Sequence, residues 1–243
     1  MNATILHNKK VLITAGPTRE AIDPVRYISN HSTGKMGYAI AEQFLQQGAE
    51  VFLVSGPVTI GLKHPNLTII HINSASEMYL ACCHFFEQVD IAVFAAAVAD
   101  YRPAKTAEQK IKKDESTFTI SMVKNADIAY EFGKIKTASQ IAIGFALETN
   151  DELVHAQGKL QKKNFDMVVL NSMNDANATF GYDTNKITVI KKDQLPKEFS
   201  LKQKSEVARD IVREISSLLI SQYESEEIRE LNKETSQNKG GRK

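Results

Sequence analysis

Short apolar runs alternate with helical patterns along most of this chain. Residues 11–15, VLITA, form an apolar run that is too short for a helix and that ends at Gly16 and Pro17. Such a run is typical of a strand buried on both faces of a sheet. Over residues 35–47 the apolar side chains recur at helical spacing, and Gly48 follows as a C-cap. The chain therefore opens with a predicted strand, a long loop and a helix.

The same alternation continues and predicts the fold class. Further strands are expected at residues 51–54, 67–70, 91–97, 118–122, 141–145 and 167–170, with helices at 76–88, after 125 and at 151–163. Residues 187–190 are expected to form a hairpin or edge strand, and residues 207–219 a closing helix. This order indicates an α/β fold with three layers, in which a mostly parallel sheet carries helices on both faces. In such sheets, ligands bind beyond the carboxyl ends of the strands.

The pattern predicts one domain over residues 1–222. From about residue 223 to residue 243 the chain is charged and polar, which favours a frayed or disordered tail. No internal repeat is evident in the sequence.

The loop at residues 23–37, DPVRYISNHSTGKMG, is the most informative segment. It is rich in turn formers and runs into a helix N-terminus, where free N–H groups and the helix dipole favour an anion. A P-loop would need glycine where Ser29 stands and Ser or Thr where Met36 stands. The dinucleotide fingerprint also fails, because the turn after the first strand, AGPTR, has one glycine and a proline. The loop therefore predicts an anion site of neither type.

Composition narrows the functional classes. A formal net charge of +1 gives no reason to expect nucleic acid as a partner, since its binders carry a marked basic excess. No stretch is apolar for the roughly 20 residues that a membrane span requires, and the start of the chain has no signal-peptide pattern, so we expect a cytoplasmic protein. Cys82 and Cys83 are adjacent within a predicted helix and favour packing over a disulfide or metal site.

The end of the fourth predicted strand, at residues 91–97, and the segment after it carry a second set of candidate residues. Small side chains at residues 95–97 allow close approach of a ligand to the backbone, and Asp100 could accept hydrogen bonds from a ribose or a base. Tyr101 and Lys105 have the spacing of short-chain dehydrogenases, but Pro103 would break the helix turn that this pair requires. Lysines that could neutralise polyphosphate charge follow at positions 110, 112, 113, 124, 159, 162 and 163.

These motifs resemble the phosphopantothenate-cysteine ligase family of coenzyme A biosynthesis. The resemblance rests on TAGPTRE (14–20), the loop at 23–37, AAVADY (96–101), KIKK (110–113), MVKN (122–125), GFALET (144–149) and KNFD (163–166). The match runs in order over nearly the whole chain, to about residue 220. The family implies a modified Rossmann-like fold, a homodimer with the site near the subunit boundary, and a flap, which would be residues 110–115 here. It often occurs fused behind a flavin-dependent decarboxylase, so this chain is expected to be a free-standing ligase with a possible separate decarboxylase partner.

The resemblance also implies the reaction. The carboxylate of 4'-phosphopantothenate would attack the α-phosphorus of CTP, pyrophosphate would leave, and the amine of L-cysteine would attack the acyl-cytidylate to give phosphopantothenoylcysteine and CMP. Activation is needed because a carboxylate has no good leaving group, whereas a mixed anhydride releases a phosphate monoester. Lysines and Mg²⁺ suit the charge that grows on pyrophosphate. The sequence itself leaves the metal ligands unassigned.

The family motif implies a role for individual positions. Asn30 would hold the acyl-nucleotide intermediate, Lys110 would bind the nucleotide and form that intermediate, and Arg26 and Ala97 match further positions tied to the site. The positions that match nucleotide contacts are Phe94, Ala95, Ala96, Asp100, Lys110, Ala126, Asp127, Ile128, Ala129, Phe145, Lys159 and Lys163.

The chain departs mildly from the family pattern and leaves two alternatives. Thr33 stands where Ser is common, Ala126 where Pro often occurs, and Leu147 where Ala is frequent; Leu147 could reshape the base pocket and alter the preference for CTP. An NAD(P)-dependent oxidoreductase would share the fold but should have a glycine-rich first turn. A non-catalytic nucleotide-binding module would need Phe145 and Asp100 but not Asn30 together with Lys110.

Overall fold

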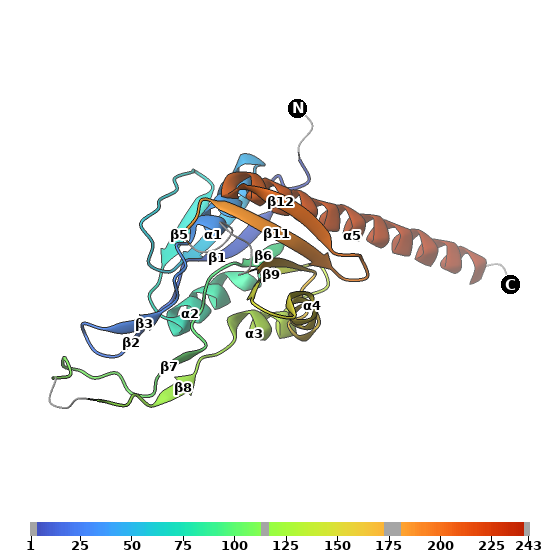
Figure 1. Ribbon diagram of the computed structural model, residues 1–243. Coiled ribbons are helices and arrows are strands. Elements are labelled where there is room, and N and C mark those ends of the chain that lie inside the picture. The colour runs from blue at the N-terminus through green and yellow to red at the C-terminus, as the bar shows by residue number, and fades with distance from the viewer. Residues whose placement is uncertain (1–3, 113–116, 173–180, 241–243) are drawn as a thin grey trace.

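An eight-stranded sheet forms the centre of the protein (Figure 1). The structure is a computed structural model and describes residues 4–112, 117–172 and 181–240. The strand order in the sheet is β12-β11-β10-β9-β6-β1-β4-β5. These strands are β1 (Lys10–Ala15), β4 (Glu50–Ser55), β5 (Leu67–His71), β6 (Ile91–Phe94), β9 (Ile141–Glu148), β10 (Met167–Ser172), β11 (Thr184–Lys191) and β12 (Lys197–Gln203). The pairs from β5 to β10 are parallel, and β11 and β12 add antiparallel strands at one edge.

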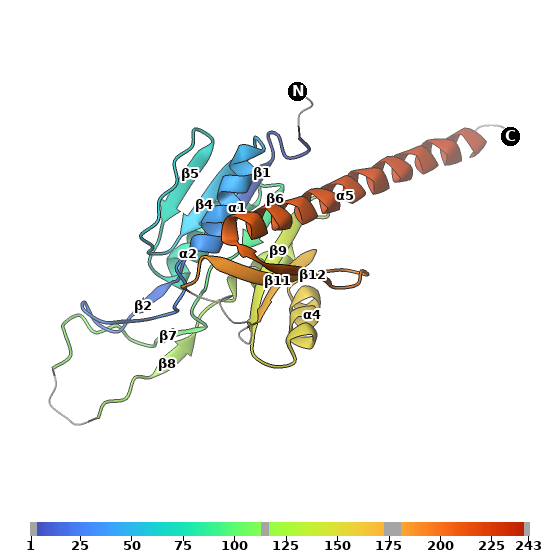
Figure 2. The same ribbon diagram turned by 45° about the horizontal axis from the view of Figure 1, so that its top comes forward.

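Helices cover both faces of this sheet, as the alternation in the sequence predicts. On one face lie α1 (Lys35–Gln46) and α5 (Lys204–Gly240); Figure 2 shows that α5 begins next to α1 and then extends away from it. On the other lie α2 (Ala75–Phe86), α3 (Ile128–Ile135) and α4 (Glu152–Lys162). Strand β1 shows why both faces need cover: Val11, Ile13 and Ala15 belong to the first core, and Leu12 belongs to the second. The three-layer α/β fold is therefore confirmed.

Two short ribbons project from the carboxyl side of the sheet (Figure 1). One pairs β2 (Arg19–Ala21) with β3 (Tyr27–Ser29), and the other pairs β7 (Tyr101–Pro103) with β8 (Met122–Lys124). They lie side by side, and the Ala107 amide donates to the Ile22 carbonyl at 3.0 Å. We call them together the paired ribbons. The sequence pattern does not predict them, because strands of three residues are too short to show a period.

Several predicted boundaries differ from the structure. Strand β6 ends at Phe94 and not at residue 97. Beyond it the Ala95 and Ala97 amides still donate to the Thr14 and Gly16 carbonyls, and Ala97 forms an isolated bridge with Pro17. The prediction of a strand at 118–122 is wrong for residues 118–121, because β8 covers Met122–Lys124. The hairpin or edge strand expected at 187–190 is β11, paired with β12. Gly48 follows α1 with φ +83° and donates to the Leu45 carbonyl, as a C-cap glycine does.

The last helix is longer than the sequence predicts. The structure continues α5 from Lys204 through Gly240, across most of the segment for which a frayed or disordered tail is expected. Its first half packs on the sheet through residues such as Val207, Ile211 and Ile215, which are fully buried. Beyond residue 223 the sequence consists mainly of Glu, Lys, Arg, Asn, Ser and Gln, with few apolar residues, so a continued helix there rests on local propensity. Among the described residues, no helix is both long and apolar enough to cross a membrane.

Candidate active site

The carboxyl ends of β1, β6 and β9 bring the predicted site segments together. The Ala95 amide donates to the Thr14 carbonyl at 3.2 Å, and the Ala97 amide donates to the Gly16 carbonyl at 2.9 Å. These bonds hold residues 95–97 against the turn after β1, and small side chains keep their backbone accessible. Two pockets open at this edge, one on each side of the segment.

The first pocket, which we call the helix pocket, lies at the N-terminus of α1. It is lined by residues 32–37, 95–97 and 145–147 and by Asn171, Asn185 and Lys204. Gly34 occupies the N-cap position with φ +75°, and no side chain caps the helix. A Cβ on Gly37 would lie 2.6 Å from the Ala15 Cβ, so glycine is what allows α1 to start so close to β1. The uncapped N–H groups and the dipole favour an anion here, as the sequence predicts.

Two lysines border the helix pocket. Lys35 Nζ lies 2.5 Å from Asp183 Oδ1, and Lys204 Nζ donates to the Tyr182 carbonyl. Burial, and next the nearby charge of Lys35, hold the pKa of Lys204 below its usual value. The Lys35 ammonium in turn lowers the pKa of Asp183. An anion in this pocket would lie near two lysines, of which Lys35 is paired with Asp183.

The second pocket, which we call the strand-end pocket, has a volume of about 420 Å³ and lies on the other side of residue 96. It shares Ala96 and Phe145 with the helix pocket. Among the residues proposed from the sequence for the nucleotide, those that line it are Phe94, Ala96, Asp100, Ala126, Asp127, Ile128, Ala129, Phe145 and Lys163. The structure thus brings together residues from three of the motifs, at 96–101, 144–149 and 163–166, with Phe94 and the segment 126–129.

One wall of the strand-end pocket is built at the start of α3. Asp127 is the N-cap of this helix, and its Oδ1 accepts from the Tyr130 amide at 3.1 Å. Lys163 reaches the same carboxylate from the end of α4, with Nζ 2.9 Å from Oδ1. The Lys163 ammonium and the N-terminus of α3 therefore lie close together, and both favour the binding of a phosphate.

Asn30 connects the loop after β3 with the segment between the two pockets. Its Nδ2 donates to the Ala97 carbonyl at 3.0 Å. Ser29 is anchored nearby, because its hydroxyl donates to the Thr18 carbonyl at 2.7 Å. Asn30 and Ala97, both proposed for the reaction, are therefore direct neighbours.

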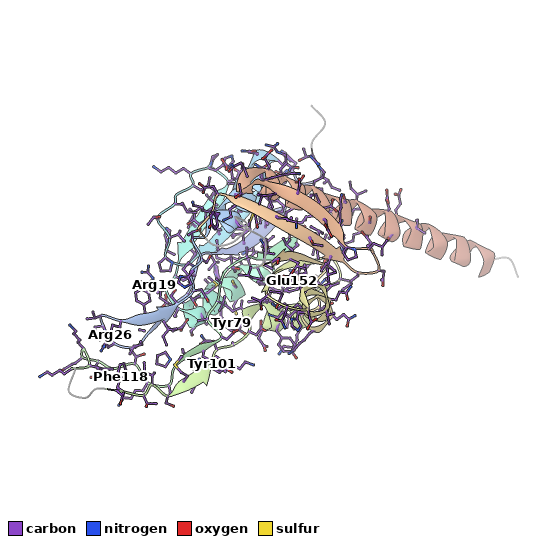
Figure 3. The ribbon with its side chains drawn as sticks, viewed as in Figure 1. Arg19, Arg26, Tyr79, Tyr101, Phe118 and Glu152 are labelled. Carbon is purple, nitrogen blue, oxygen red and sulfur yellow. The ribbon has the colours of Figure 1, made fainter. Side chains whose placement is uncertain are left out.

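Three other proposed residues lie elsewhere. Of the described residues, neither Arg26 nor Lys110 lines either pocket; they lie out along the paired ribbons, where Figure 3 shows Arg26 near Phe118. The Arg26 guanidinium carbon is 5.8 Å from the centre of the Phe118 ring. Lys159 also lies outside both sets of lining residues, and its Nζ is 2.7 Å from Glu148 Oε1. Residues 113–115 of the expected flap fall outside the described residues.

Asn125 supports the strand-end pocket and is not singled out by the sequence. It is buried, its Nδ2 donates to the Ala99 carbonyl at 2.8 Å, and its Oδ1 accepts from Arg102 Nη1 at 2.8 Å. The backbone N–H of Asn125 donates to the Asp100 carbonyl at 2.8 Å. Asn125 therefore holds the backbone that carries Asp100, and its place in the MVKN motif was the available signal.

The comparison with protein families identifies the chain. The model described as the DNA/pantothenate metabolism flavoprotein C-terminal domain matches residues 6–219. The chain belongs to this family. The match ends within α5 and includes every element that builds the two pockets.

Members of the family include longer proteins with different names. The chain is 46% identical over 216 residues to the coenzyme A biosynthesis bifunctional protein CoaBC of Vibrio vulnificus, covering 88% of this chain and 53% of that protein. It is 48% identical over 214 residues to a cysteine/cysteine sulfinic acid decarboxylase of an unknown prokaryote, covering 88% of this chain and 60% of the relative. The chain thus spans about half to three-fifths of the length of these curated relatives.

A solved structure of a family member has the same fold. The crystal structure of the C-terminal domain of CoaBC matches with a TM-score of 0.76 and 38% identity, over 91% of this chain and 100% of that one. The domain resembled by this chain is therefore the C-terminal domain of the bifunctional protein.

Proposed function

We propose that this protein is a phosphopantothenate-cysteine ligase of coenzyme A biosynthesis. Three substrates are proposed: 4'-phosphopantothenate, L-cysteine and CTP. The observation that carries the proposal is the pair of pockets that share Ala96 and Phe145. A ligase of this kind must hold two anionic substrates next to each other, with their reacting ends close and their remaining charges apart. The likeness to the C-terminal domain of CoaBC supports the same assignment.

In this proposal the phosphate of phosphopantothenate binds in the helix pocket. The uncapped N-terminus of α1, Lys35 and Lys204 supply the positive electrostatic field. The carboxylate end of the substrate then points past Ala97 toward the strand-end pocket. Asn30 lies beside Ala97 and could donate to the acyl-nucleotide intermediate once its present partner, the Ala97 carbonyl, is exchanged.

The nucleotide binds in the strand-end pocket. Phe145 offers a ring face for the base, Asp100 offers a carboxylate for a ribose or base donor, and Lys163 with the start of α3 offers charge for phosphate. Leu147 borders the adjoining helix pocket, so its effect on the choice between CTP and ATP would act through the shared wall. Lys159 lies one turn before Lys163 and would add charge after leaving Glu148.

Mg²⁺ fits this site as an ion that arrives with the nucleotide. Among the described residues, no group of three or more His, Cys, Asp or Glu side chains could hold a metal ion on its own. Magnesium in nucleotide sites is bound mainly by phosphates and water, with one or two carboxylates. Asp100, whose exposed carboxylate lines the strand-end pocket, is the residue here that could serve. When bound, the ion would neutralise charge on the departing pyrophosphate.

The reaction then has two steps. An oxygen of the phosphopantothenate carboxylate forms a bond to the α-phosphorus of CTP as the bond to pyrophosphate breaks. The amine of cysteine next attacks the acyl carbon, loses a proton, and expels CMP. The protein's contribution is orientation and positive charge: the backbone at residues 95–97 and Asn30 hold the acyl end, and lysines stabilise the charge that develops on phosphate oxygens.

The paired ribbons suit a homodimer. Their exposed large apolar side chains are Val25, Tyr27, Tyr101, Phe118, Met122 and Val123. Apolar side chains gathered at one projecting feature often mark an interface. A second copy of this chain would cover them and bring Arg26 and Lys110 toward a site at the subunit boundary. We further propose a cytoplasmic location and, as a possible partner, a separate decarboxylase.

Pyrophosphate release tests the proposal. The purified full chain is incubated with Mg²⁺, 4'-phosphopantothenate and either CTP or ATP, with and without L-cysteine. Release that requires phosphopantothenate and favours CTP is expected, and Asn30→Asp and Lys110→Gln should abolish it without changing the circular dichroism spectrum. No release with either nucleotide would favour a nucleotide-binding module, and carbon dioxide from cysteine alone would favour a decarboxylase. Hydride transfer with NAD(P) would favour the oxidoreductase alternative.

A further inference from the structure

Asp23 joins two segments of the paired ribbons through an unusually complete set of hydrogen bonds. Its side chain is fully buried, and its two oxygens serve different partners. Oδ1 accepts from the Val25 and Arg26 amides at 2.9 and 2.8 Å, which closes the turn between β2 and β3. Oδ2 accepts from Arg26 Nε at 3.0 Å and Nη2 at 2.5 Å, and from the Ile111 amide at 3.2 Å.

Arg26 completes the same connection from the other side. Its Nη2 also donates to the Ile111 carbonyl at 3.1 Å. Both backbone polar groups of Ile111 are thus held by the Asp23–Arg26 pair, and Ile111 directly follows Lys110. The Arg26 hydrogen bonds hold the pKa of Asp23 far below its usual range.

We infer that Asp23 is a positioning residue that sets the place of Lys110 by fixing the neighbouring peptide at Ile111. This inference rests on the proposed function for its kinetic effect, but the connection itself does not. Within the described residues, the Lys110 ammonium makes no hydrogen bond or ion pair that would define its place, so its place follows from the neighbouring peptide, which is fixed at Ile111. Arg26, assigned to the site from the sequence, acts in this view through the backbone at Ile111.

The two carboxylate oxygens of Asp23 have different partners, so one substitution can disrupt the bonds of one oxygen and keep those of the other. In Asp23→Asn the amide oxygen can replace Oδ1 and keep the turn, while the NH₂ group faces the three donors that Oδ2 accepts. The change therefore cuts the connection to Ile111 and spares the hairpin. Thr106→Val is the matched control, because the Thr106 hydroxyl donates to the Ala21 carbonyl at 3.2 Å and joins the same two segments without touching Ile111.

The kinetic test compares pyrophosphate release by the full chain and by the two variants. We expect Asp23→Asn to lower kcat about 10- to 100-fold, since small displacements of reacting groups have effects of this size. Thr106→Val should stay within about twofold of the parent, because it leaves the bonds to Ile111 in place. An unchanged kcat in Asp23→Asn, or an equal loss in Thr106→Val, would overturn the inference.

Amide exchange tests the connection without any substrate. By NMR, the Ile111 amide of the unchanged protein should exchange at least about tenfold more slowly than the Lys110 and Lys112 amides, because a held amide exchanges only when its bond opens. Asp23→Asn should remove that protection, and Thr106→Val should keep it. Equal exchange of the three amides in the unchanged protein refutes the inference even where ligase activity is present, or where Asp23→Asn does not fold. Protection at Ile111 in a protein that releases no pyrophosphate would instead refute the proposed function and support the connection.

Discussion

Lys163 at the end of α4 lies 2.9 Å from both carboxylate oxygens of Asp127, the N-cap residue of α3. This pair closes one wall of the strand-end pocket with two elements that are distant in sequence. Asp127 has two tasks here, since it also accepts from the Tyr130 amide. Variants can separate the tasks because asparagine is as good an N-cap as aspartate but carries no charge.

Lys163→Met should weaken nucleotide binding and leave the fold intact. The variant keeps the apolar stem and removes the charge that we assign to phosphate, so the KM for CTP should rise about tenfold, which corresponds to about 1.4 kcal/mol. Steady-state pyrophosphate release measures this. An unchanged KM would remove Lys163 from the nucleotide site.

Asp127→Ala should destabilise the protein more than Asp127→Asn does. The alanine variant loses the helix cap and the ion pair, at a cost of about 1 kcal/mol for the cap, whereas asparagine loses only a partly exposed ion pair worth about 0–1 kcal/mol. Urea unfolding of the two variants is the measurement. Equal destabilisation would show that the cap contributes little.

Asn30→Asp should abolish pyrophosphate release with little change in stability. The amide nitrogen of Asn30 donates to the Ala97 carbonyl, and an aspartate would set a carboxylate oxygen against that carbonyl and against the anionic intermediate. We expect a loss of at least about 100-fold in kcat, the size seen when one donor to a developing charge is removed. Asn30 is an exposed side chain, so a fall in the unfolding midpoint that accounts for the lost activity would argue instead for a structural role.

Gly37→Ala should damage the helix pocket through a packing clash. The added Cβ would lie 2.6 Å from the Ala15 Cβ, so α1 must move away from β1, and we expect a loss of about 1–3 kcal/mol in stability together with weaker binding of phosphopantothenate. Thermal unfolding and calorimetric titration measure the two effects.

Gly158→Ala is the matched control for this variant. Gly158 lies within α4, and a Cβ there meets nothing within 4 Å, so alanine should stabilise the helix by about 0.5–1 kcal/mol. Binding that falls equally in both variants would contradict the role given to Gly37.

The sequence predicts the central fold and the residues of the strand-end pocket better than it predicts the paired ribbons. Buried parallel strands and amphipathic helices leave strong periods, and β1, α1, β9 and β10 follow from them directly. The ribbons contain strands of three residues whose pairing depends on contacts far along the chain, such as Asp23 with Ile111. Asp23 followed by Pro24 does suggest a turn with a side-chain acceptor, but no local pattern indicates its second partner.

Motifs predict residue types at the site, but they do not predict the alternative partners that the fold supplies. The motif assigns Lys159 to the nucleotide, and the structure pairs it with Glu148. It assigns Arg26 to the site, and the structure directs its guanidinium to Asp23 and Ile111. Such pairings arise only when distant segments meet, so they require three-dimensional information.

Glu214→Gln should destabilise the protein at neutral pH and much less in acid. Glu214 is nearly buried and lies 2.7 Å from Lys191 and 2.6 Å from Lys197. Burial by itself would raise the pKa of Glu214, but the hydrogen bonds from the two lysines outweigh it and hold the pKa below its usual value. A depressed folded-state pKa gives stability that is present above the unfolded-state pKa of about 4.3 and is lost as pH falls through the folded-state value. The glutamine leaves the buried Lys191 without its counter-charge, at a cost of about 3 kcal/mol near pH 7.

Urea unfolding of both proteins between pH 3 and pH 7 tests this, with Glu42→Gln on the exposed side of α1 as the control. The gap between the parent and Glu214→Gln should narrow below about pH 4, because protonation then neutralises the parent's own carboxylate. The control should stay within about 0.5 kcal/mol of the parent across the range, as surface substitutions generally do. A gap that is constant with pH would show that the packing of Glu214, and not its charge, stabilises the end of the sheet.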